Sequence, residues 1–274
     1  MDVNPTMRTR LGKVWRIGWT ALSLVVVEGT VVGLAIVPAA WLMQWPWGLV
    51  LRSMMLAPAY VAFALALMAL SATAMRLCGW RTPPDVQTRI TDLEWPLLDW
   101  VRYMVSSHLV RVFAGTLFRA TPVWSLYHRL NGARLGRGVY INSLAVVDDN
   151  LLEFGDHVVI GHGVHLSGHT VEQGFLKTGA VRLGADVTIG VESVIGIGVE
   201  IGAGTQIGAL SLVPKHQRLE GGAFFGGAPV HRLDVADLSG RSAARGTSRR
   251  PTPAAPIPPR GGTSPSPTRV PGRA

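Results

Sequence analysis

A six-residue repeat constrains the fold of this chain more than any other feature. Between Val181 and Gly208 an aliphatic residue followed by glycine returns at every sixth position. The pairs are Leu183-Gly184, Ile189-Gly190, Ile195-Gly196, Ile201-Gly202 and Ile207-Gly208. Six is not the period of an α-helix, but it is a multiple of the two-residue period of a strand. The repeat therefore predicts short strands separated by tight corners.

The same period continues on both sides of this run. Upstream it holds at Leu135-Gly136, Ile141 and Val147, and after one extra residue it resumes at Phe154-Gly155, Ile160-Gly161 and Leu166. Downstream it continues to Val213. A repeat of this kind is typical of stacked coils, because one coil cannot bury its apolar side alone. We predict an all-β parallel β-helix over residues 131–236, with three hexads per triangular coil and about four coils. A second inward position takes small residues, namely Val187, Ser193, Val199 and Thr205.

The period fails between Leu166 and Val181, in the stretch "SGHTVEQGFLKTGA". Insertions between repeats often line a binding face, so this stretch is where we expect a site. It also contains the densest reactive chemistry of the chain. The residues concerned are His169, Glu172 and Lys177, with His162 and His165 just before them.

Two apolar stretches precede the repeat, at residues 17–43 and 53–75. The whole chain is 48% hydrophobic and only 16% charged, with a mean hydropathy of +0.29. Each stretch exceeds the ~20 residues that cross a bilayer core. The sequence therefore predicts a transmembrane hairpin within residues 1–83, broken by "MQWPWG". Glu28 lies inside the first span, and both a functional and a purely structural role stay open for it.

Flanking charge predicts the orientation of this hairpin. Four basic residues precede the first span, namely Arg8, Arg10, Lys13 and Arg16, and two follow the second span, Arg76 and Arg81. The connecting turn has only Arg52, at its end. By the positive-inside rule both ends face the cytoplasm. We expect a multi-pass protein of the plasma membrane whose β-helix domain is cytoplasmic.

Residues 84–130 mix aromatic and aliphatic residues with arginine and histidine. This pattern predicts amphipathic helices on the membrane surface, with basic side chains toward the headgroups. Those side chains are Arg102, Arg111, Arg119 and Arg129.

The last segment, residues 237–274, is rich in Pro, Ser, Gly and Thr, and from Ser239 onward it carries seven arginines and no acidic residue. Such a composition predicts disorder. Most of the net charge of +9 lies there, so the rest of the chain gives no indication of a nucleic-acid partner. The single cysteine, Cys78, excludes an internal disulfide.

The hexads resemble those of the hexapeptide-repeat, left-handed β-helix acyltransferases. The segment "FFGGAPVHRL" resembles their closing G-x-P-A signature at Gly227, Ala228, Pro229 and Val230, where Val230 departs from the usual alanine. A narrower resemblance covers Leu97 to Leu233 through "ATPVWSLYHRLNGARLGRGVYINS", "NLLEFGDHVVIG" and "HTVEQGFLKTGAVRLG". These are similar to the C-terminal membrane region of poly-amino-acid synthetases, the non-ribosomal peptide synthetases of the ε-poly-lysine synthetase type. This chain has no adenylation or carrier domain.

The resemblance implies a homotrimeric enzyme that transfers an acyl or aminoacyl group in peptide or secondary-metabolite biosynthesis. The donor would be a thioester on coenzyme A or on a phosphopantetheinyl carrier protein, and no cofactor would be bound permanently. A histidine would act as general base on an amine or hydroxyl acceptor. A synthetase and membrane lipid are the other implied partners.

Within this frame we assign His169 as the general base, with Glu172 either orienting it or binding an amine acceptor. Lys177, His165 and Asp149 are candidates for substrate binding. Asp148 and Asp149 lie where the repeat stutters, so a contact to a cationic group and a turn role both stay open. No Ser-His or Cys-His arrangement is apparent in the sequence, which favours direct attack on the thioester.

Two alternatives stay open at this point. His162, His165 and His169 could hold zinc, since γ-class carbonic anhydrases use the same fold, but their ligands follow a different spacing. We therefore predict no metal site. The chain could also be a non-catalytic trimeric scaffold that docks a synthetase on the membrane.

Overall fold

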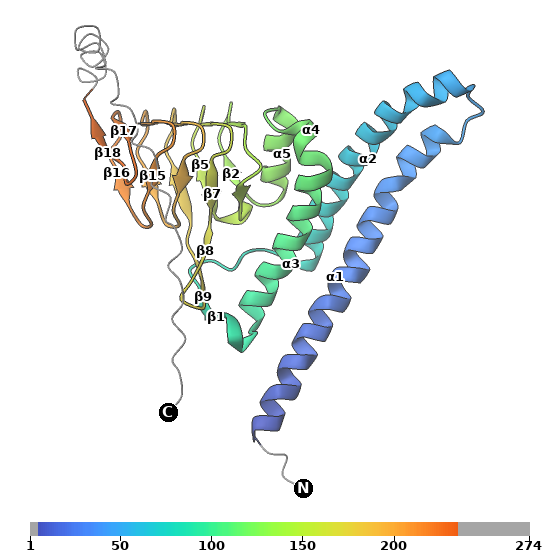
Figure 1. Ribbon diagram of the computed structural model, residues 1–274, viewed down its shortest axis with the longest axis horizontal. Coiled ribbons are helices and arrows are strands. Elements are labelled where there is room, and N and C mark those ends of the chain that lie inside the picture. The colour runs from blue at the N-terminus through green and yellow to red at the C-terminus, as the bar shows by residue number, and fades with distance from the viewer. Residues whose placement is uncertain (1–4, 235–274) are drawn as a thin grey trace, which may run out of the picture. The chain divides into compact units, whose positions relative to one another are not determined.

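The computed structural model describes residues 5–234, and the predicted tail lies outside them. The chain begins with two long antiparallel helices, α1 (Pro5–Met43) and α2 (Leu49–Cys78), joined by a short turn (Figure 1). Both are long and apolar enough to cross a membrane, judged by length and composition alone. Helix α2 is capped by Gly79, which adopts a left-handed conformation with a φ of 68°.

A second group of helices follows and packs on this hairpin. It is preceded by β1 (Gln87–Arg89) and a 3-10 turn, η1 (Ile90–Asp92). The helices are α3 (Trp95–Val110), the π-helical segment η2 (Arg111–Gly115), α4 (Thr116–Phe118) and α5 (Pro122–Leu130). Helix α3 contacts both α1 and α2. Its buried residues Leu97, Leu98 and Tyr103 therefore face protein.

The predicted exposure of the arginines in this region is wrong at two positions. Arg102 is only 6% exposed, and its guanidinium donates to the hydroxyls of Ser23, at 3.1 Å, and Thr20, at 3.2 Å, both on α1. Arg129 donates from Nε to the carbonyl oxygen of Leu135 at 3.3 Å. Hydroxyls and carbonyls of the protein thus satisfy these cations where we expected lipid headgroups.

The remainder consists mainly of three sheets that the chain visits in turn (Figure 1). One contains β2 (Arg134–Leu135), β5 (Leu152–Phe154), β10 (Val181–Leu183), β13 (Glu200–Ile201) and β16 (Arg218–Leu219). The next contains β3 (Tyr140–Ile141), β6 (Val159–Ile160), β11 (Thr188–Ile189), β14 (Gln206–Ile207), β17 (Phe224–Gly226) and β18 (His231–Leu233). The third contains β4 (Val146–Val147), β7 (His165–Ser167), β12 (Val194–Ile195) and β15 (Leu212–Val213). All strand pairs in these sheets are parallel except the closing pair of β17 and β18.

The aliphatic residue of each hexad pairs with its equivalent in the next coil. Ile189 lies between Ile160 and Ile207, and all three are at most 2% exposed. The second inward residues are buried as well, among them Val187 and Thr205. Parallel stacking of inward aliphatic residues is what the six-residue period predicts, and it removes apolar surface from water at every coil.

The two irregularities of the repeat have definite structures. The extra residue near position 150 forms the 3-10 turn η3 (Asp149–Leu151), and it shifts the register so that Val146, rather than Val147, pairs with Leu166. The longer interruption folds as a hairpin of β8 (His169–Glu172) and β9 (Phe175–Thr178). Strand β1 pairs antiparallel with β9, so a small sheet projects from the stacked strands (Figure 1).

Candidate active site

The hairpin that interrupts the repeat carries His169 at the start of β8. Its Nδ1 lies 2.6 Å from Oδ2 of Asp148, and we assign the ring proton to this nitrogen because a carboxylate can only accept. Asp148 is completely buried, whereas the His169 side chain is 18% exposed. The other ring nitrogen, Nε2, is then left with its lone pair. A buried carboxylate thus fixes both the tautomer and the orientation of a partly accessible imidazole.

The stutter in the repeat is what brings Asp148 to this position. Asp148 has a φ of 65° and begins the turn η3, so its side chain points away from the regular inward row. Both carboxylate oxygens have donors: Thr82 Oγ1 donates to Oδ1 at 2.6 Å, and Ser167 Oγ lies 3.1 Å from Oδ2. These contacts hold a charged group that would be costly to bury alone.

Ser167 and Trp100 complete the surroundings of His169. A serine therefore does lie beside the histidine, contrary to our expectation, but Ser167 is only 3% exposed and its hydroxyl already contacts Asp148. It is not available as a nucleophile to a bound substrate. The indole of Trp100, on α3, meets the imidazole edge-on with 4.9 Å between ring centroids. An element of the N-terminal helices thus forms one wall of the site.

A groove of about 500 Å³ begins at this histidine and runs across β7, β12 and β15. Its floor includes Val194 and Leu212, which remain 40% and 38% exposed, and Lys215 also lines it. His165 also lines the groove, and desolvation, with a smaller effect of the nearby His169, lowers the pKa of its imidazole. The groove therefore offers a largely apolar channel with two imidazoles at one end.

Glu172 does not have the first role that we considered for it, which was to orient His169. Asp148, not Glu172, orients His169. Glu172 instead forms ion pairs with Lys177, at 2.8 Å, and with Lys215. Hydrogen bonds from these two ammonium groups lower the pKa of the Glu172 carboxyl to about 2. Lys177 is thus held by a carboxylate on its own hairpin.

Asp149 lies away from the groove, and its predicted contact to substrate is wrong. Asp149 and His128 are each 2% exposed, with 2.5 Å between Oδ1 and Nδ1. The backbone N–H of Asp149 donates to the hydroxyl of Tyr103 at 2.8 Å. Burial and the carboxylates of Asp149 and Asp148 raise the pKa of this phenol well above its usual value. The two neighbouring aspartates therefore form two histidine pairs on opposite sides of one turn, one of them fully buried.

The three histidines weighed as zinc ligands do not act together. Nδ1 of His162 lies 3.0 Å from the guanidinium of Arg119, and Nδ1 of His169 is occupied by Asp148. Within residues 5–234 no group of three or more His, Cys, Asp or Glu side chains is arranged to hold a metal ion.

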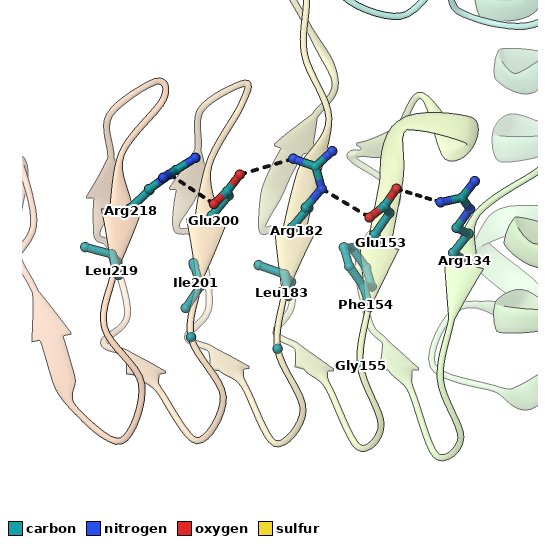
Figure 2. Close-up of a pocket in the computed structure, with 12 residues that line it drawn as sticks. Arg134, Glu153, Phe154, Gly155, Arg182, Leu183, Glu200, Ile201, Arg218 and Leu219 are labelled. Carbon is teal, nitrogen blue, oxygen red and sulfur yellow. Dashed lines mark hydrogen bonds and ion pairs between the residues drawn. The ribbon is translucent and has the colours of Figure 1, made fainter.

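A second groove lies on another face of the stacked strands and has a different character. Five side chains of alternating charge form a continuous row across its sheet, one from each strand (Figure 2). The row, which we name the charge ladder, consists of Arg134, Glu153, Arg182, Glu200 and Arg218. Neighbouring members contact at 3.0–3.1 Å, so each glutamate accepts from two arginines. The ladder contains no nucleophile or base beyond these paired carboxylates.

Sequence comparisons give no match: no protein-family model and no curated protein matches this chain. Among solved structures, the hexapeptide-repeat acetyltransferase VCA0836 from Vibrio cholerae aligns over 38% of this chain and 62% of its own, with 24% identity and a TM-score of 0.34. A galactoside acetyltransferase in complex with coenzyme A aligns over 38% and 55%, with 29% identity and a TM-score of 0.32. Serine acetyltransferase from Neisseria gonorrhoeae, in complex with serine, aligns over 78% and 73%, with 16% identity and a TM-score of 0.36. The chain spans less than two thirds of the first of these structures, and scores of this size do not establish a family.

Proposed function

We propose that this chain is an acyltransferase of the hexapeptide-repeat, left-handed β-helix class. It would transfer an acyl or aminoacyl group from a thioester, on coenzyme A or a carrier protein, to an amine or hydroxyl acceptor. The observation that carries this proposal is the pair of His169 and buried Asp148 at the end of an apolar groove. That pair supplies the one group that direct acyl transfer from a thioester requires, a positioned general base.

The proposed reaction follows from the assigned tautomer. Nε2 of His169 accepts the proton of the acceptor hydroxyl or amine while the acceptor oxygen or nitrogen attacks the thioester carbonyl carbon. The tetrahedral intermediate then collapses, the carbon–sulfur bond breaks, and the thiolate leaves with the proton returned from His169. Asp148 stabilises the imidazolium that exists between the two proton transfers.

The groove supports a long, thin donor. Its exposed apolar floor at Val194 and Leu212 fits a pantetheine arm or an acyl chain, because both are extended and carry methylene groups that can contact apolar side chains. His165 lies at the same end as His169 and would contact the acceptor side. Its lowered pKa favours the neutral form, which can accept or donate a hydrogen bond.

Membrane anchoring is part of the same proposal. Helices α1 and α2 expose large apolar side chains along their length, and Trp41 and Trp45 lie near the connecting turn, where an interfacial belt is expected. We propose that the hairpin crosses the plasma membrane and that the stacked strands face the cytoplasm. Homotrimeric assembly, and a role beside a peptide synthetase in peptide or secondary-metabolite biosynthesis, rest on the sequence resemblance alone.

The test compares cells that produce the wild-type chain, His169→Ala and His157→Ala at equal membrane levels. His157 is a matched control because its side chain is 66% exposed and, within residues 5–234, forms an ion pair with exposed Asp186 alone, at 3.4 Å. Extracts are searched by untargeted mass spectrometry for an acylated or peptide-bonded product. We expect a product in the wild type and in His157→Ala that is absent in His169→Ala. A product at equal level in all three would remove His169 as the base, and its absence from all three would favour the scaffold alternative.

A further inference from the structure

We infer that Thr82 is a positioning residue of the active site, so that the segment leaving the hairpin completes the catalytic pair. This inference rests on the proposed function of His169. Thr82 lies three residues beyond Gly79, which ends α2, and it is completely buried. Its hydroxyl donates to Oδ1 of Asp148 at 2.6 Å. The carboxylate that orients the base is thus itself held by a residue from the N-terminal region.

The two oxygens of Asp148 differ in how many donors they have. Oδ2 lies within hydrogen-bonding distance of both His169 and Ser167. Oδ1 has Thr82 as its one side-chain donor within residues 5–234. Removing the Thr82 hydroxyl therefore leaves one oxygen of a buried carboxylate without a side-chain donor. The carboxylate is then held through Oδ2 alone, so the acceptor for Nδ1 of His169 is less firmly oriented.

The position of Thr82 is itself held by an exchange of hydrogen bonds with Asn150. The backbone N–H of Thr82 donates to Oδ1 of Asn150 at 3.1 Å, and Nδ2 of Asn150 donates to the carbonyl oxygen of Thr82 at 2.8 Å. Asn150 belongs to the turn η3 that begins at Asp148. Thr82 is therefore fixed to the same turn that it stabilises, which gives its hydroxyl a defined direction.

The residues after Thr82 hold the other member of the pair. The Thr178 hydroxyl donates to the carbonyl oxygen of Pro83 at 2.7 Å and accepts from the N–H of Val86 at 2.9 Å. Thr178 lies directly opposite His169 in the β8–β9 hairpin. Strand β1, which follows, pairs with β9 from Gln87 to Arg89. Residues 82–89, which we name the strap, thus contact the supports of both Asp148 and His169.

The arrangement has a consequence for the role of the N-terminal region. A simple anchor could be replaced by any other membrane segment without loss of chemistry. Here the strap continues directly from α2, and Thr82 and Thr178 make its contacts to the site. The end of the hairpin is therefore a part of the active site, and changes there alter the orientation of the base.

The experiment uses the full chain in detergent with ¹⁵N-labelled histidine and compares Thr82→Val, Thr82→Ser and Thr88→Val with the wild type. Thr88 is a matched control because it lies buried in the strap and its hydroxyl makes no hydrogen bond within residues 5–234. Long-range ¹H–¹⁵N spectra report the tautomer of each imidazole, and His169→Gln assigns the signal. We expect the Nδ1–H form of His169 in the wild type, Thr82→Ser and Thr88→Val, and a mixture of tautomers in Thr82→Val.

A kinetic measurement on the same four proteins follows thiol release from acetyl-coenzyme A with the acceptor identified by mass spectrometry. The loss of a hydrogen bond to a charged group predicts a kcat lower by about 10- to 150-fold in Thr82→Val, with KM nearly unchanged and with activity restored in Thr82→Ser. An unchanged tautomer and kcat in Thr82→Val would overturn the inference, as would an equal loss in Thr88→Val. If the wild type releases no thiol, the acyltransferase proposal fails for this donor, while the tautomers still decide the role of Thr82.

Discussion

The substitution Asp148→Asn tests the catalytic pair most directly, because it keeps the shape of the side chain and removes its charge. In the wild type, Oδ2 accepts from His169 Nδ1–H over 2.6 Å in a fully buried position. A hydrogen bond to a charged group contributes about 1.5–3 kcal/mol, which corresponds to a factor of about 10–150 in rate. If the new amide N–H₂ faces Nδ1, the proton must move to Nε2 and the base is lost, with an effect of up to about 10⁴. We expect a loss in kcat of at least tenfold.

The neighbouring substitution Asp149→Asn provides the control. It makes the same chemical change one residue away, on a carboxylate that is equally buried but pairs with His128 outside the groove. We expect a lower melting temperature for Asp149→Asn, and a kcat within threefold of the wild type for the folded enzyme. The assay is the rate of formation of the acylated product by purified protein in detergent. A kcat within threefold for Asp148→Asn, or equal losses for both variants, would refute the assignment of Asp148.

Two further predictions concern stability. Ile195→Ala should destabilise the stacked strands by about 2–5 kcal/mol, because Ile195 is 1% exposed between Leu166 and Val213. Val194→Ala, on the outer face of the same strand, should cost less than about 1 kcal/mol. Thermal unfolding followed by circular dichroism compares the two variants, and equal costs would contradict the inward stacking. The ion pairs of Glu172 depress its pKa from an ordinary 4.5 to about 2, so they stabilise the fold above pH 4.5 and this contribution is lost as the pH falls to about 2. The difference in melting temperature between the wild type and Glu172→Gln should therefore shrink to zero between pH 4.5 and about 2. A difference that does not depend on pH would argue against these ion pairs.

The sequence predicts the stacked strands well because their signal is local and repeated. Each aliphatic residue from Leu183 to Ile207 recurs at the same interval and pairs with its equivalent in the next coil. The one error of register, at Val146 and Val147, occurs beside the turn η3, where the repeat carries its extra residue. Periodicity identifies that a residue is inserted but not how the chain accommodates it.

The candidate site is predictable only in part, because the repeat identifies single residues and not the partners that folding brings to them. His169 stands out because it lies in the segment that breaks the repeat, but its partner Asp148 is 21 positions away, and the two are joined by folding. The two carboxylates of the stutter look alike in sequence, and only the turn assigns one to the groove and the other to the interior. Thr82 carries no motif at all. The sequence does not predict the burial of Arg102, because its partners on α1 are 79 and 82 positions away.

The sequence also carries a signal for the charge ladder. Each member directly precedes an apolar residue of the hexad repeat in the same sheet, as in Arg182-Leu183 and Glu200-Ile201. The contacts between members are exposed to solvent, so they contribute little to stability individually. Arg182 and Glu200 are 18 residues apart, which is one coil, so the sign of the charge reverses at each coil.

Because the sign of the charge alternates, only an even change in the number of coils keeps opposite charges beside each other. Deleting the one coil that contains Glu200 would bring Arg182 beside Arg218, and two like charges directly opposite each other destabilise a sheet. Deleting two adjacent coils would restore the match between opposite charges. Duplication and loss of single repeats is the simplest way for a solenoid to change its length, yet here it is disfavoured in odd steps. The five charges thus favour changes of two coils at a time, because an odd change within the row places like charges beside each other.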